Sequence, residues 1–89
     1  MLEASDHAAR LRIGRPIAFG PMALLAIERV TLRTHHSHAG VCLWVVLQPH
    51  ALIVRDAGGT RAYDPNATAI SLARLRQAAP GLDAALAAL

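Results

Sequence analysis

Scarce residue types set the first limits on this sequence, which has one cysteine, no lysine and three aromatic residues. With Cys42 alone, no disulfide can form within the chain, so packing has to stabilise the fold. The nine basic residues form no run and the aromatic residues are scattered, whereas nucleic-acid surfaces combine a basic stripe with stacking rings. The composition therefore argues against a nucleic-acid partner, and binding through Arg29, Arg33, Arg55 and Arg61 is kept as a third alternative.

Long hydrophobic runs are missing too. The longest apolar stretch covers residues 39–47, whereas a membrane-spanning helix needs about 20 residues. The opening letters MLEASD carry acids where a secretion signal would have a basic region. We therefore predict a cytoplasmic protein without membrane insertion.

The length and composition fit one domain. If a chain of 89 residues formed two hydrophobic cores, each would be too small to fold without disulfides or metals. A hydrophobic fraction of 54% is enough for a single core. Residues 1–12 mix small, acidic and basic residues, and we expect a loosely ordered N-terminal arm with one or two helical turns capped by Ser5. Residues 13–89 are predicted to form a single α+β domain.

The middle of the chain has the pattern of strands, and the end has the pattern of helices. Turn residues at positions 20–21 and 57–59 separate segments that are rich in β-branched and apolar residues. From Ser71, a plausible N-cap, the apolar spacing becomes helical, and residues 80–81 divide two short helices. We predict an antiparallel sheet of four to five strands with a C-terminal helical segment packed on one face. The expected strands are residues 16–19, 22–36, 41–48, 50–56 and 60–63.

One long strand changes its apolar side. Leu25 and Ile27 alternate on one face, whereas Val30 and Leu32 follow the opposite parity. Because a slip of one residue moves every side chain to the other face, the change predicts a β-bulge or a bend near residues 26–29.

Residues 41–47 are apolar at every position, which is typical of a strand buried on both faces. A short helical tail can cover one face of a sheet, and the remaining face needs another cover because large exposed apolar patches are unusual in monomers. We predict a non-enzymatic module that binds itself as a homo-oligomer, and an unknown protein partner as well. A curled, barrel-like monomer is the alternative. The expected interface residues are Leu43, Trp44, Val45, Val46 and Ile53.

The histidines His35, His36 and His38 form the most conspicuous polar cluster. In a strand, His36 and His38 would point to one face about 6.5 Å apart, which suits two ligands of Zn²⁺ or Cu²⁺. Two ligands do not complete a site, and the register decides whether Cys42 or His50 joins them. The alternatives are solvent-facing histidines at a hairpin tip, a transition-metal site, and a response to pH between about 5 and 8.

Other candidates for chemistry have simpler interpretations. Cys42 lies in an apolar strand, where a thiol is a small hydrophobic residue more often than a nucleophile. Asp56 and Asp64 flank a predicted hairpin and are expected to form turns or to pair with Arg55 and Arg61. We therefore expect no catalytic residues and no required cofactor.

Residues 13–82 resemble the sporulation-associated GerW or YtfJ family. The resemblance rests on IGRPIAFG followed by MALLAIERV, on GVCLWVVLQPHALIVRDAGGTRAYD, and on ISLARLRQAAPGL. The chain departs from the family at residues 34–38, where the family is glycine-rich, and at Glu28, where the family has proline. The resemblance implies a cytoplasmic accessory or assembly protein linked to sporulation or germination, and it implies no catalytic residues.

Overall fold

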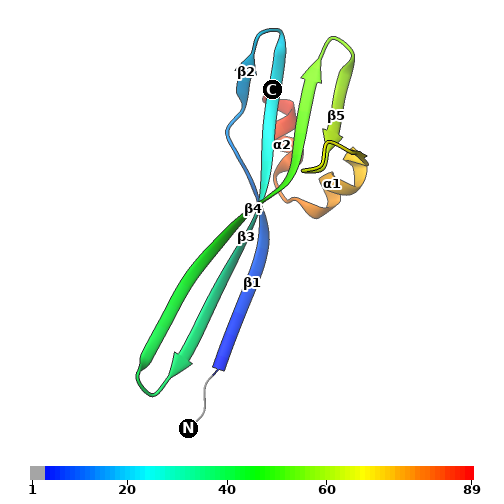
Figure 1. The fold of residues 1–89 in the computed structure, drawn as a ribbon. Coiled ribbons are helices and arrows are strands. Elements are labelled where there is room, and N and C mark those ends of the chain that lie inside the picture. The colour runs from blue at the N-terminus through cyan, green and yellow to red at the C-terminus, as the bar shows by residue number, and fades with distance from the viewer. Residues whose placement is uncertain (1–3) are drawn as a thin grey trace.

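The computed structural model describes the chain from Ala4 to Leu89 as one antiparallel sheet followed by two short helices. The sheet has six strands in the order β1-β3-β4-β5-β6, with β2 beside β3 (Figure 1). The elements are β1 (Ala4–Ile13), β2 (Ile17–Phe19), β3 (Met22–Ser37), β4 (Gly40–Asp56), β5 (Gly59–Tyr63), β6 (Ala69–Ile70), α1 (Leu72–Ala78) and α2 (Leu82–Ala87).

The long hairpin of β3 and β4 runs through the whole molecule and divides it into two regions (Figure 1). We call the region of residues 13–27 and 51–89 the head, which holds both helices and the short strands. We call the region of residues 4–12 and 28–50 the extension, a three-stranded sheet of β1, β3 and β4 that projects away from the head.

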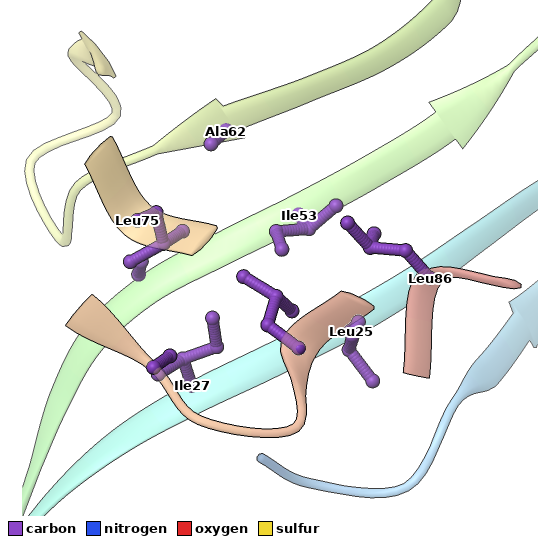
Figure 2. Packing of buried hydrophobic residues seen from close by; sticks show 9 residues of the cluster. Leu25, Ile27, Ile53, Ala62, Leu75 and Leu86 are labelled. Atoms are coloured by element: carbon purple, nitrogen blue, oxygen red, sulfur yellow. The ribbon is translucent and has the colours of Figure 1, made fainter. Parts of the chain in front are cut away.

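The core lies in the head, between the sheet and the two helices. Alternate side chains of a strand share a face, so Leu25 and Ile27 of β3 point with Ile53 of β4 toward Leu75 and Leu86 of the helices (Figure 2). The other members of the cluster are Ala51, Ala62, Ala79 and Leu82.

Local chemistry explains where the head elements begin and turn. The β2–β3 hairpin closes through Gly20, whose φ of +60° favours glycine, and Pro21. The Ser71 hydroxyl accepts a hydrogen bond from the Arg74 backbone N–H at 3.2 Å, which caps α1 as predicted. The predicted turn at residues 20–21 and the predicted cap are confirmed.

A β-bulge marks the boundary between head and extension. Ile27 pairs with Ala51 but Glu28 pairs with Pro49, so β4 has one extra residue, His50, between the two pairs. The predicted irregularity near residues 26–29 is confirmed, although the extra residue lies on β4. We call the part of the sheet around Ile27 and His50 the waist. Because bulges increase local twist, this position fits the strong twist of the sheet at the waist (Figure 1).

The sequence prediction of the sheet needs three corrections. The sheet has six strands where four to five were expected, because Ala4–Ile13 and Ala69–Ile70 add two strands while the predicted strands 41–48 and 50–56 form the single strand β4. Ala4–Ile13 is a strand paired with β3, where helical turns were expected, and residues 1–3 of the predicted arm lie outside the described residues. Pro49 does not end a strand, because β4 continues through it. Pro49 lies where β4 is an edge strand, and its missing N–H removes no hydrogen bond between strands there.

The shape is extended for the size of the chain. Its radius of gyration is 16.9 Å, whereas about 12 Å is typical of a folded chain of this length. Its accessible surface is 6327 Å², whereas a compact monomer of this mass exposes about 5,000 Å². Among the described residues, neither helix has the length and apolar character needed to cross a membrane.

Candidate interaction surface

The side of the sheet away from the helices is apolar along most of its length. Residues that pair directly across antiparallel strands share a face, and the core residues Leu25 and Ile53 define the face toward the helices. We call the opposite side the helix-free face. Eight of the nine exposed large hydrophobic residues lie on it: Ile17, Phe19, Leu32, Val41, Leu43, Val45, Leu47 and Leu52.

The extension has no cover on either face. No residue from 28 to 50 is buried, although this region includes seven consecutive apolar residues of β4. On the helix-free face, Val30 pairs with Leu47 and Leu32 pairs with Val45, which makes a ladder of aliphatic side chains. On β3 the apolar residues change from odd to even positions, and on β4 the extra residue His50 brings the odd-numbered residues to the helix-free face, so the apolar side changes on both strands at the same point.

The structure separates the five predicted interface residues into three groups. Leu43 and Val45 are 62% and 56% exposed and lie on the helix-free face. Trp44, 45% exposed, and the half-buried Val46 lie on the opposite face of the same strand. Ile53 is 0% exposed and packs in the core under the helices, so it is not part of the helix-free face.

The face of the extension on the helix side is more polar. Trp44 pairs with Arg33, and Arg29 lies on the same face four residues away along β3. Two other arginines considered for nucleic acid are engaged in the head. Arg55 donates to Thr60 Oγ1 and to the Leu86 carbonyl, and Arg61 pairs with Asp56.

The histidines do not form the expected pair on a strand. The turn of the long hairpin is His38 and Ala39, closed by Ser37 and Gly40, so His38 is not a strand residue. Cys42 lies directly opposite His35 and therefore on the face away from His36. No three His, Cys, Asp or Glu side chains of the described chain come together as metal ligands, and the metal alternative is not carried forward.

The carboxylates of the head and waist have structural partners. Glu28 accepts a hydrogen bond from Arg12 at 2.9 Å, and Asp83 pairs with Arg76. Asp64 accepts hydrogen bonds from two backbone N–H groups of the loop that follows β5, as expected of a turn residue. A shallow hollow between β4 and α1 is lined by His50, Ile70, Ser71, Arg74, Leu75 and Ala78 and contains no acid.

Sequence reasoning missed most of the helix-free face. Val41, Leu47 and Leu32 belong to it, and Ile17 and Phe19 of β2 continue it into the head. A signal was present in the letters, because residues 34–54 contain no Asp, Glu, Lys or Arg. Such a charge-free stretch is unusual in a strand that faces solvent.

The comparisons with known proteins add no relative. No family model, curated protein or solved structure matches the chain. The resemblance to the GerW or YtfJ family therefore stays a prediction.

Proposed function

We propose that the protein is a non-enzymatic assembly module that binds a second copy of itself through the helix-free face. The observation that carries the proposal is the row of exposed aliphatic side chains on the helix-free face of the extension, which consists of Leu32, Val41, Leu43, Val45 and Leu47. Burying apolar surface is the main favourable term in most protein association, and a patch this long is unusual on a monomer.

The available area supports a stable interface. The chain exposes roughly 1,300 Å² more than a compact monomer of its mass, and standard interfaces bury about 800 Å² on each partner. The helix-free face follows the 17 residues of β4. At about 3.3 Å per residue and about 4.8 Å between three strands, it covers about 800 Å² in projection.

The charge distribution favours a second copy as the occupant. A two-fold contact places the same patch on both sides, and a patch without charge meets itself without repulsion. Residues 34–54 supply no formal charge, while Arg10, Arg12 and Glu28 lie at the side of the ladder. An apolar centre with a charged border is the usual anatomy of a protein interface.

The test is the mass in solution, measured by light scattering over a range of concentrations. The wild-type chain should have at least twice the 9.4 kDa mass of one chain. In Leu32→Arg/Val45→Arg, two facing arginines enter the helix-free face, and the mass should fall by at least half. A wild-type monomer at every concentration would refute the proposal.

A matched control uses the neighbouring pair of residues on the same two strands. Thr31 pairs with Val46 on the opposite face of the extension. Thr31→Arg/Val46→Arg adds the same charge and should keep the mass of the wild type. If this variant loses the assembly and Leu32→Arg/Val45→Arg keeps it, the interface lies on the other face.

The resemblance to the GerW or YtfJ family adds a proposed process, sporulation or germination, in which this assembly would act. Its support is the three short stretches of similar sequence. Deletion of the gene from a spore-forming source should then lower the yield of spores or their germination, and L32R/V45R should fail to restore it where T31R/V46R succeeds.

A further inference from the structure

The outer edge of β4 in the extension has no neighbouring strand among the described residues. β5 pairs with β4 from Leu52 to Asp56 only, so the edge of residues 41–49 is open. The other side of the extension is formed by β1, which pairs with β3 along its length. Open edges present rows of backbone donors and acceptors that can take up another strand.

The register shows which backbone groups point to the open edge. The Gly14 N–H donates to the Ala26 carbonyl at 2.8 Å, on the side of β3 away from β4. The backbone N–H and C=O groups of even-numbered β3 residues therefore point away from β4. In an antiparallel ladder the direction alternates, and odd-numbered residues such as Arg33 therefore bond to β4. Their partners on β4 are even-numbered, as Trp44 is. The N–H and C=O groups of Val41, Leu43, Val45 and Leu47 consequently point outward.

The two edges of the extension differ in charge. Strands at sheet edges usually carry charges that prevent pairing with other chains, and β1 follows this rule with Arg10 and Arg12. The β4 edge has no formal charge from residue 40 to residue 54. Two β4 edges can therefore meet without opposing like charges, whereas two β1 edges paired about Leu11 would set Arg10 against Arg12.

We infer that a second copy adds its β4 antiparallel to this edge, with the two-fold axis at Trp44. This inference rests on the proposed function and deepens it. Pro49 has no N–H and ends the useful edge. A centre at Trp44 pairs Val41 with Leu47 and Leu43 with Val45 across the axis. All four outward N–H groups are then bonded and Pro49 is left outside.

The axis places Trp44 beside Trp44 of the partner subunit in a pair without direct backbone hydrogen bonds. Side chains approach most closely in such pairs, and aromatic pairs across strands are favourable. The heads lie at opposite ends of the joined sheet, so they do not meet. The contact explains why an exposed tryptophan lies on the more polar face of the extension.

Edge pairing and face packing are compatible and predict a subunit count. A two-fold axis perpendicular to the sheet keeps both helix-free faces on one side, where they form a wider apolar surface. Two such edge-paired dimers can then pack face to face, which gives four copies with the symmetry common among tetramers. L32R/V45R should reduce this assembly from four chains to two.

A disulfide scan tests the edge contact. In a Cys42→Ser background, Trp44→Cys places two thiols across the axis, within the Cα separation of about 4.4–6.8 Å that a disulfide requires. Mild oxidation should convert most of this variant to a cross-linked dimer. The control Cys42→Ser/Val46→Cys separates the thiols by four residues along the strands and should cross-link at least about tenfold less. Equal cross-linking of both variants would overturn the inference.

Amide exchange of the wild-type chain gives a second readout that needs no substitution. If the edges pair, the Leu43 and Val45 amides should exchange within about tenfold of the Trp44 and Val46 amides, which bond to β3. An assembly with rapidly exchanging Leu43 and Val45 amides would refute edge pairing but keep the proposed function. A wild-type monomer would refute both.

Discussion

The head and the extension are built from the same two long strands, and the comparison shows what makes a sheet stable. In the head, Leu25 of β3 and Ile53 of β4 are 0% exposed because two helices cover them. In the extension, Leu32 and Val45 also pair across β3 and β4, on the helix-free face, but they are 41% and 56% exposed. Strand pattern and pairing are similar in both regions, and the difference is the presence of a covering layer.

The comparison also predicts that the head and the extension of a single chain differ in local stability. Isolated sheets of two or three strands are marginal in water without a packed face, whereas the nine-residue cluster of the head provides a core. We therefore expect the extension to open locally at a lower free energy than the head. Assembly would supply the missing cover, which couples the order of the extension to protein concentration.

The largest expected difference comes from the same truncation in both regions. In the L32R/V45R background, where face packing is removed, Leu25→Ala should lower the free energy of unfolding by about 2–5 kcal/mol, because it leaves a cavity in the core. Leu43→Ala on the 62% exposed site should change it by less than about 0.5 kcal/mol. Urea unfolding followed by circular dichroism measures both values. Equal losses would show that the extension contributes as much to stability as the head.

The next prediction concerns the contact that ties α2 to the sheet. Arg55 donates to Thr60 Oγ1 at 2.9 Å and to the Leu86 carbonyl at 3.0 Å. Arg55→Ala should cost about 1–3 kcal/mol, since it removes charge-assisted hydrogen bonds from a half-buried site. Arg61→Ala is the control, because its exposed pair with Asp56 contributes about 0–1 kcal/mol. A smaller loss for Arg55→Ala than for Arg61→Ala in urea unfolding would contradict the assignment.

Two serines allow a finer comparison of head and extension. The Ser71 hydroxyl caps α1, and the Ser37 hydroxyl accepts a hydrogen bond from the Ala39 N–H in the turn of the extension. Ser71→Ala should cost about 1 kcal/mol in thermal or urea unfolding, as N-cap removal does. Ser37→Ala should leave the main transition unchanged within about 0.5 kcal/mol. A larger effect of Ser37→Ala would place the turn within the cooperative unit of the head.

Local signals in the sequence predicted much of the head. The turn at Gly20, the N-cap at Ser71 and the bulge opposite Ile27 depend on neighbouring residues and are confirmed. The assignment of faces depended on pairs distant in sequence. Ile53 was placed in an interface because its apolar strand gave no sign of which side the helices cover.

The extension was harder to predict because its strands are long and its pairing is non-local. Ala4–Ile13 alternates small and polar residues in a way that permits helical turns, and its pairing with residues 27–36 of β3 decides for a strand. His38 lies in the turn because the hairpin closes at Ser37 and Gly40, a register that the sequence left open. The apolar strand of the candidate surface could be predicted from the sequence. The free edge of β4 could not be predicted, because it depends on where the pairing with β5 ends.

The smallest expected effect concerns the exposed ion pair at the waist, where the two regions meet. Arg12 and Glu28 are 2.9 Å apart with side chains 58% and 31% exposed. A double-mutant cycle of Arg12→Ala and Glu28→Ala in urea unfolding should give a coupling of about 0.2–1 kcal/mol, because solvent screens exposed pairs. This coupling appears in the unfolding transition of the head only if β1 unfolds together with the core. A coupling of zero, with both single variants as stable as the parent chain, would show that β1 separates from the head before the core opens, and would leave Arg12 and Glu28 outside the cooperative unit of the head.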